Sequence, residues 1–195
     1  MQTINKTLFN PSGNLSFCVR KDEDLNLFIL MNGSDCNLNI SLQEQTAECH
    51  LSVVYLSDAS HKNTLKCRME HLAPHTKSYQ YVKGVATGKT TGVFEGVIHI
   101  EKDAQKCEGY QKHAGILLSD DATIKAIPEL NIYADDVMCS HGSAVGPLDE
   151  EQVFYLMARG IDENKAKEML LSGFLSENLT DDMQNDVKNW IIEHV

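Results

Sequence analysis

Short runs of alternating hydrophobic and polar residues fill the first part of the chain. In the run GVFEGVIHI, at residues 92–100, alternation places Glu95 and His99 on one face of an extended strand and Phe94 and Ile98 on the other. Turn-forming residues separate the runs, and many short strands in series predict a β-sandwich, a barrel or a solenoid. The strands alone do not decide among these three. The other runs are LNLFILM, NLNISL, CHLSVVYL, TLKCRMEHL, YQYVKGV, GILLS and LNIYADDV.

After Pro147 the pattern changes to helical spacing. Three stretches begin with a residue that can cap a helix and continue with apolar residues three or four positions apart. The capping residues are Asp149, Asp162 and Thr180. Gly160 is expected to end the first helix in a left-handed conformation, and the second helix is expected to end near Gly173. We therefore expect a β-rich core over residues 1–146 and a helical domain over residues 147–195.

The composition excludes several classes of protein. The 195 residues are 42% hydrophobic and 23% charged, which is typical of a globular protein. With 17 Lys and Arg against 28 Asp and Glu, the formal net charge is −11, so phosphate backbones repel the chain and nucleic-acid binding is not expected. No apolar run approaches the roughly 20 residues that cross a bilayer. The N-terminus MQTINKTLFN does not resemble a secretory signal. We therefore expect a cytoplasmic protein that binds no membrane.

The negative charge is concentrated in the helical part. Residues 149–195 carry 11 acidic and 4 basic side chains, a net −7, whereas the other 148 residues carry 17 and 13, a net −4. This asymmetry indicates either an ordinary solvated helix surface or a docking surface for a more basic partner.

The common motifs of enzymes are missing or incomplete. The segment GVATGKT, at residues 84–90, has three residues between its glycines where a phosphate-binding loop needs four, and a strand pattern follows it. The chain contains no G-x-S-x-G, H-E-x-x-H or dinucleotide-binding fingerprint. Its six cysteines form no C-x-x-C pair, and we expect most of them to be small buried hydrophobes. We therefore expect no bound nucleotide.

The most suggestive chemistry lies in the segment DDVMCSHG, at residues 135–142. On a strand, Cys139 and His141 are two residues apart and project from the same face. A thiolate beside an imidazole suits a soft metal such as iron or zinc. Two ligands are too few for a closed site, so the remaining ligands would come from elsewhere in the chain or from a second subunit. The alternative is a buried cysteine next to a turn.

The stretch from residue 126 to residue 175 closely resembles the conserved end of the SufB/SufD family of iron–sulfur cluster assembly proteins. Its sequence is AIPELNIYADDVMCSHGSAVGPLDEEQVFYLMARGIDENKAKEMLLSGFL. Three upstream segments fit the same family: HLAPHTKS, GVFEGVIHIEKDAQK and GILLSDDATIKAIPELNI. The resemblance covers about residues 70–175.

This resemblance implies a fold and a set of partners. The fold is a right-handed parallel β-helix core followed by a small α-helical domain, which selects the solenoid among the three architectures. The core would pair with a SufB-like subunit or with a second copy of the chain. The helical domain would dock on a SufC-type ABC ATPase, and the chain itself would be a scaffold rather than an enzyme. The residues that the resemblance places in the docking region are Phe154, Tyr155, Arg159 and Gly160.

The resemblance also implies a site. The Cys-Ser-His-Gly sequence at residues 139–142 matches the SufD-like pattern, in which His141 lies at the subunit interface beside Cys139 and is implicated in assembling a transient iron–sulfur cluster. SufB-like members have a cysteine near the position of His113, so His113 is a third candidate ligand. The chain is short for the family at its N-terminal end, where a cap or a partner would have to cover the β-helix.

Two other functions stay open at this point. One is a degenerate family member that binds the ATPase but assembles no cluster. The other is an enzyme built on a β-helix, such as a lyase or an acyltransferase.

Overall fold

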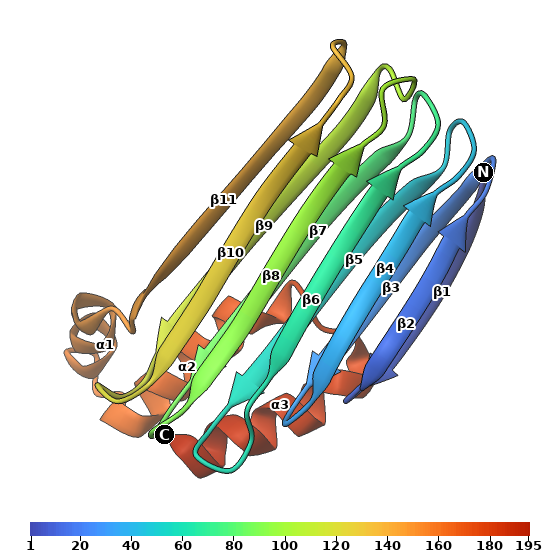
Figure 1. Cartoon of the computed structure of the whole chain (residues 1–195). Helices are drawn as coiled ribbons and strands as arrows, with labels where there is room; N and C mark the ends of the chain where they lie inside the picture. Colours follow the sequence, from blue (N-terminus) through green and yellow to red (C-terminus); the bar gives the residue numbers. More distant parts are fainter.

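The computed structural model describes residues 1–195 as a series of strands followed by three helices (Figure 1). The strands are β1 (Gln2–Phe9), β2 (Gly13–Val19), β3 (Glu23–Met31), β4 (Asp35–Leu42), β5 (Glu48–Ser57), β6 (Thr64–His71), β7 (Lys77–Ala86), β8 (Thr91–Ile100), β9 (Cys107–Leu117), β10 (Thr123–Ile132) and β11 (Val137–Pro147). The helices are α1 (Glu150–Met157), α2 (Glu163–Ser176) and α3 (Asp181–His194). None of the helices is both long enough and apolar enough to span a membrane.

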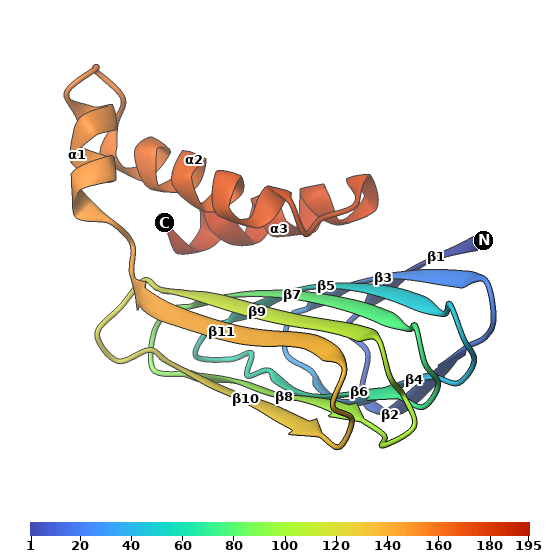
Figure 2. The same ribbon diagram turned by 90° about the horizontal axis from the view of Figure 1, so that it is seen from above.

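The strands form two parallel sheets. The odd-numbered strands form a six-stranded sheet in the order β1-β3-β5-β7-β9-β11, and the even-numbered strands form a five-stranded sheet in the order β10-β8-β6-β4-β2. All neighbours are parallel, and the chain crosses to the other sheet after each strand, so it coils as a solenoid (Figures 1 and 2). This confirms the expected parallel β-helix with C-terminal helices and excludes the sandwich and the barrel.

The core between the sheets follows from the alternation in the sequence. In β8, the inward-facing Phe94 and Ile98 are fully buried, as the pattern predicts. Each coil stacks its apolar side chains on those of the preceding coil; Ile40, Met69 and Ile98, for example, occupy the same register position on successive strands. Each such side chain contributes about 1.5–3 kcal/mol when it leaves water.

Helices α2 and α3 cover part of the outer face of the six-stranded sheet, whereas α1 stands away from it (Figure 2). A second apolar cluster joins the helices to the sheet. Its buried members are Leu30, Val54, Leu56, Val85, Leu171, Leu175, Met183, Val187, Trp190 and Ile191. Polar contacts add to the attachment: Asn178 Nδ2 donates to the backbone oxygen of Tyr81 at 2.7 Å, and Lys83 Nζ donates to that of Phe174 at 2.6 Å. The division of the chain into two domains between residues 146 and 147 stays a prediction, because the helices and the sheet share the second apolar cluster.

The helix ends agree with the expected caps in part. Asp149 accepts from the backbone of Glu151 and Asp162 accepts from that of Asn164, while Thr180 occupies a cap position without a side-chain hydrogen bond. Gly160 has φ +84°, the left-handed conformation that ends a helix.

The expected end of the second helix, near Gly173, is three residues early. Helix α2 continues to Ser176. The buried Leu171 and Leu175, four residues apart, extend its apolar stripe past the glycine. A glycine in a helix costs only about 1 kcal/mol relative to alanine, which this packing outweighs.

Candidate functional site

The last coil of the solenoid leaves two sheet edges unpaired. In the six-stranded sheet β11 pairs only with β9, and in the five-stranded sheet β10 pairs only with β8. Figure 1 shows both strands at the end of the solenoid opposite β1 and β2. Unpaired edges present free backbone donors and acceptors, which can pair with another chain. The candidate ligands Cys139 and His141 both lie on β11.

Cys139 is partly buried at this end. Its register partner on β9 is Gly109, which has no side chain to stack against the thiol. A Cβ built on Gly109 would lie 3.1 Å from Ile98 Cγ2, 3.4 Å from Cys139 Sγ and 3.6 Å from Nε2 of His71, so these groups border the space beside the glycine. Burial raises the pKa of the Cys139 thiol, and a hydrogen bond from the backbone N–H of Gly109 acts in the opposite direction. The thiol of the free subunit is therefore protonated at neutral pH.

His141 is exposed and lies beside Gln111 in the register. Residues 139, 141 and 143 share one face of β11 by strand alternation. Cys139 faces Gly109, and Ser143 contacts His113, so this face is directed toward the interior of the solenoid. Because β11 is the last strand of its sheet, the imidazole is open to a ligand or to a second chain.

His113 is buried, and both of its ring nitrogens are hydrogen-bonded. Nε2 lies 2.8 Å from the Tyr55 hydroxyl and Nδ1 lies 3.1 Å from Ser143 Oγ. The ring also stacks on Phe94, with centroids 5.4 Å apart. Burial lowers the pKa of His113 to about 4, so the ring is neutral at pH 7. His113 would have to give up one of these hydrogen bonds to bind a metal.

No group of three or more His, Cys, Asp or Glu side chains is arranged to hold a metal ion within this chain. Cys139 and His141 are the two candidate ligands that an external partner can reach, because one is partly exposed and the other is exposed. A four-ligand site would need groups from another chain or from the bound species. The chain alone thus presents two candidate ligands at an open sheet edge.

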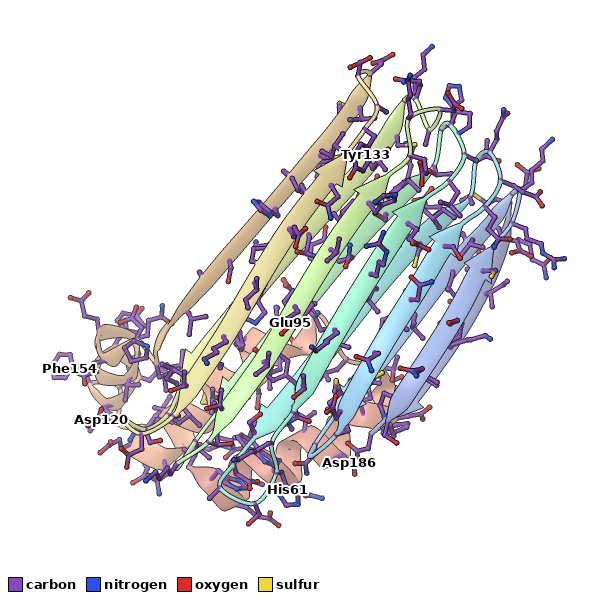
Figure 3. The ribbon with its side chains drawn as sticks, in the orientation of Figure 1. His61, Glu95, Asp120, Tyr133, Phe154 and Asp186 are labelled. Atoms are coloured by element: carbon purple, nitrogen blue, oxygen red, sulfur yellow. The ribbon has the colours of Figure 1, made fainter.

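The residues expected to dock a partner form an exposed surface on and after α1. The side chains of Phe154 and Tyr155 are 70% and 56% exposed, and Figure 3 shows Phe154 projecting away from the solenoid. The Arg159 guanidinium lies 3.5 Å from the centroid of the Tyr155 ring, and Nη1 donates to the Tyr155 backbone oxygen at 3.1 Å. Gly160 follows directly in its left-handed conformation.

Sequence reasoning missed a cavity of about 780 Å³ beside this surface. It lies between α1, α2, the end of the chain and the loop between β9 and β10, and no local motif marks it because its walls come from distant segments. The apolar residues of its lining are Leu117, Leu118, Pro147, Leu148, Val153, Phe154, Met157 and Val195.

Sequence reasoning also missed the polar neighbours of the candidate ligands. Ser143 could have been found, because it continues the i, i+2 spacing of Cys139 and His141. Tyr55 and Gln111 carry no such signal, since their positions depend on the register between strands that are far apart in the sequence.

Comparison with known proteins gives consistent matches. The model of the SUF system FeS cluster assembly, SufBD core domain, matches residues 21–174. The iron–sulfur cluster assembly protein SufD of Escherichia coli is 37% identical over 118 residues, which are 60% of this chain and 28% of that protein. The protein ABCI7, chloroplastic, of Arabidopsis thaliana is 38% identical over 111 residues, 57% of this chain and 23% of that protein. An iron–sulfur cluster assembly SufBD family protein of Staphylococcus epidermidis is 27% identical over 170 residues, 87% of this chain and 35% of that protein. The matched region thus spans between about a quarter and a third of the length of these relatives.

Proposed function

Because the chain belongs to the SufBD family of iron–sulfur cluster assembly proteins, we propose that it is a non-enzymatic scaffold subunit on which an iron–sulfur cluster is assembled. The observation that carries this proposal is the pair Cys139 and His141 on the edge strand β11, reachable from outside the chain. The cluster is cargo that forms on the scaffold and leaves it.

The open end of the solenoid supports assembly with a second subunit, either a SufB-like protein or a second copy of this chain. The unpaired edges of β10 and β11 can continue both sheets into a partner. The last coil also exposes large apolar side chains that a partner would cover; Figure 3 shows one of them, Tyr133, at the end of β10. They are Ile127, Ile132, Tyr133, Met138 and Val145.

The chemistry of the site fits this arrangement. A thiolate and an imidazole are ligands that iron accepts, and two ligands from one subunit leave positions for ligands from the partner. The raised pKa of the Cys139 thiol disfavours the thiolate in the free subunit. Iron stabilises a thiolate, so iron binding would release this proton. His113, which lies behind Ser143, is a third candidate ligand at the same end.

The surface of Phe154, Tyr155, Arg159 and Gly160 supports docking of a SufC-type ABC ATPase. Aromatic residues and arginine are the residue types that contribute most to protein interfaces, and the two aromatic side chains here are largely exposed. The net charge of −7 over residues 149–195 favours a basic partner surface. In this arrangement the ATPase, not this chain, binds the nucleotide, and the complex acts in the cytoplasm.

Anaerobic reconstitution of the complex with ferrous iron and sulfide tests the proposed site. The complex of this chain with its SufC-type ATPase and any SufB-like subunit should gain the visible absorbance of an iron–sulfur cluster. Cys139→Ala and His141→Ala should each reduce this absorbance severalfold while the complex stays assembled. Cys18→Ala is the matched control, because Cys18 is an exposed free thiol on β2, at the other end of the solenoid.

The alternatives give different results. Normal reconstitution in both site variants would remove Cys139 and His141 from the site. A stable complex that never gains a cluster would identify a degenerate member that binds the ATPase only. No observation in the structure favours a β-helix lyase or acyltransferase.

A further inference from the structure

A series of hydrogen bonds runs from the middle of the solenoid to its open end. The Tyr55 hydroxyl lies 2.8 Å from His113 Nε2, and His113 Nδ1 lies 3.1 Å from Ser143 Oγ. Tyr55 and His113 are buried, whereas Ser143 is exposed on the edge strand β11. Ser143 is therefore the member of this series that a species outside the protein can reach.

The buried Tyr55 hydroxyl fixes the direction of these hydrogen bonds. His113 Nε2 is its one hydrogen-bond partner, so the Tyr55 O–H is satisfied only when it donates to that nitrogen. Nε2 then carries no proton, and the neutral ring carries its proton on Nδ1. The Nδ1–H group is therefore the donor to Ser143 Oγ.

Packing holds the His113 ring in this orientation. The ring is stacked on Phe94, with an interplanar angle of 8°. Tyr55 crosses β7 at Gly84, where a Cβ would overlap the phenol ring. A rotation of the imidazole would break both hydrogen bonds and the stacking, so Ser143 faces a fixed N–H donor.

The hydroxyl hydrogen of Ser143 is left without an acceptor in the chain. Ser143 Oγ accepts from His113, and the Ser143 side chain makes no other hydrogen bond. Ser143 lies two residues from His141 on the same face of β11, about 6.5 Å along the strand. The free O–H is thus on the face that carries the candidate ligands Cys139 and His141.

We propose that Ser143 donates its O–H to a sulfur atom of the iron–sulfur cluster held at Cys139 and His141, and that Tyr55 and His113 are positioning residues that act through Ser143. This inference rests on the proposed function, since the acceptor is the cluster. A hydroxyl whose oxygen already accepts an N–H is a stronger donor, because hydrogen bonds in series polarise one another. In this arrangement both ring nitrogens of His113 are engaged, so His113 supports the site instead of binding iron.

NMR of the full chain labelled with ¹⁵N-histidine, free of metal at pH 8, tests the direction of the hydrogen bonds. His113→Gln assigns the signals. In the unsubstituted chain His113 should be a single tautomer with its proton on Nδ1. In Tyr55→Phe, which removes only the hydroxyl, the two ring ¹⁵N shifts of His113 should move toward the average of the two tautomers.

Tyr110→Phe is the matched control, because Tyr110 lies on β9 as His113 does but stacks on Tyr79 on the outer face. A proton on Nε2 in the unsubstituted chain would overturn the proposal. Unchanged shifts in Tyr55→Phe, or an equal change in Tyr110→Phe, would also overturn it. If Tyr55→Phe does not fold, the unsubstituted chain decides, because donation to Ser143 requires a protonated Nδ1.

The reduction potential of the cluster in the reconstituted complex tests the role of Ser143. A hydrogen bond to a cluster sulfur stabilises the added negative charge of the reduced state, so its loss lowers the potential. Ser143→Ala should therefore lower the potential, and Tyr55→Phe should lower it by a smaller amount. Ser143→Thr keeps the hydroxyl and should keep the potential. Ser140→Ala is the matched control, because Ser140 is an exposed serine on the outer face of the same strand.

The outcomes separate this inference from the proposed function. Ser143 is exposed, so Ser143→Ala should fold, and a purely structural role would change the free energy of unfolding but not the potential. A cluster that forms normally and has the same potential in Ser143→Ala would overturn the role of Ser143 and leave the proposed function standing. If the complex of the unsubstituted chain gains no cluster, the proposed function fails and the role of Ser143 fails with it, whatever the tautomer of His113.

Discussion

The hydroxyl of Tyr55, on β5, lies 2.8 Å from Nε2 of His113, on β9. Strand β7 separates the two, and Tyr55 crosses it at its register partner, Gly84. A neutral His113 satisfies both contacts when the Tyr55 O–H donates to Nε2 and Nδ1–H donates to Ser143 Oγ. Through His113 and Ser143, Tyr55 therefore links the middle of the solenoid to β11, the strand that carries Cys139 and His141.

Gly84→Ala should destabilise the protein. A Cβ at this position would overlap the Tyr55 ring, so either the ring or the strand must move. We expect a loss of about 1–3 kcal/mol in the free energy of unfolding, the usual cost of adding a methyl group to a filled core. Urea denaturation measures this loss.

Gly173→Ala is the control. Gly173 is exposed in α2, and no atom lies within 4 Å of the new Cβ, so this variant should increase the free energy of unfolding by about 0.5–1 kcal/mol. Equal stability of the two variants would contradict the close packing of Tyr55 against Gly84.

Two buried histidines should make the protein less stable in mild acid. Burial lowers the pKa of both His71 and His113 to about 4. In the unfolded chain these histidines take up protons near pH 6.5, whereas in the folded chain they do so only near pH 4. The free energy of unfolding is therefore at its full value above pH 6.5 and decreases as the pH falls toward 4. At pH 5 the loss relative to pH 7 should be about 2 kcal/mol per histidine.

Urea denaturation at pH 7 and at pH 5 measures this loss. His71 makes hydrogen bonds to Thr76 and Ser78, so His71→Gln retains polar atoms at the site but cannot titrate. In this variant the difference in stability between the two pH values should fall by about half. An unchanged difference would mean that His71 takes up its proton in the folded state as readily as in the unfolded chain.

Much of the fold follows from the sequence, because strand alternation and helical spacing are local properties. The buried face of β8 and the caps of α1 and α2 are examples. The pairing of odd strands with odd strands could not be read in this way, since alternation identifies the inward face but not the neighbour. The resemblance to a family with a β-helix core supplied that information. Gly173 was misjudged because the stripe of Leu171 and Leu175 outweighs the helix propensity of one glycine.

The candidate site could likewise be predicted from the sequence only where it depends on local spacing. That Cys139 and His141 share a face needs only the two-residue period of a strand, and both lie on β11. The contacts of His113 with Tyr55, and of Gln80 with Gln111, join residues 58 and 31 positions apart. Only the register of the solenoid brings such residues together, so no local pattern predicts them.

Asp58→Ala should loosen the attachment of α3 to the solenoid. Asp58 follows β5, and its Oδ2 accepts from Trp190 Nε1 at 3.4 Å and lies 3.4 Å from His194 Nε2. Hydrogen bonds from His61 and Ser60 lower the pKa of Asp58 against the opposing effect of its burial, so the carboxylate is charged at neutral pH. Without it the buried indole N–H has no acceptor, which costs about 1–3 kcal/mol.

Hydrogen exchange measured by mass spectrometry should locate this effect. Amides of α3 should exchange faster in Asp58→Ala, whereas those of β4 and β6 should be unchanged. Asp120→Ala is the control, because Asp120 is an exposed carboxylate in the loop between β9 and β10. Faster exchange throughout the chain would indicate general destabilisation rather than release of α3.

Phe154→Ala and Arg159→Glu should weaken binding of the SufC-type ATPase. Phe154 is 70% exposed and makes no core contact that its removal would expose, so the free energy of unfolding should change by less than about 0.5 kcal/mol. Exposed aromatic side chains at the centre of an interface commonly contribute 2 kcal/mol or more, so we expect a loss of affinity of at least about 30-fold. Arg159→Glu removes the guanidinium that stacks on Tyr155, so it should act in the same direction. Isothermal titration calorimetry with the ATPase from the same genome measures the affinity of both variants.

Ile192→Ala is the control, because Ile192 is also exposed, at 56%, but lies on α3. If Ile192→Ala weakened binding as much as Phe154→Ala, the docking surface would extend along α3; unchanged affinity in both Phe154→Ala and Arg159→Glu would place the docking surface away from α1.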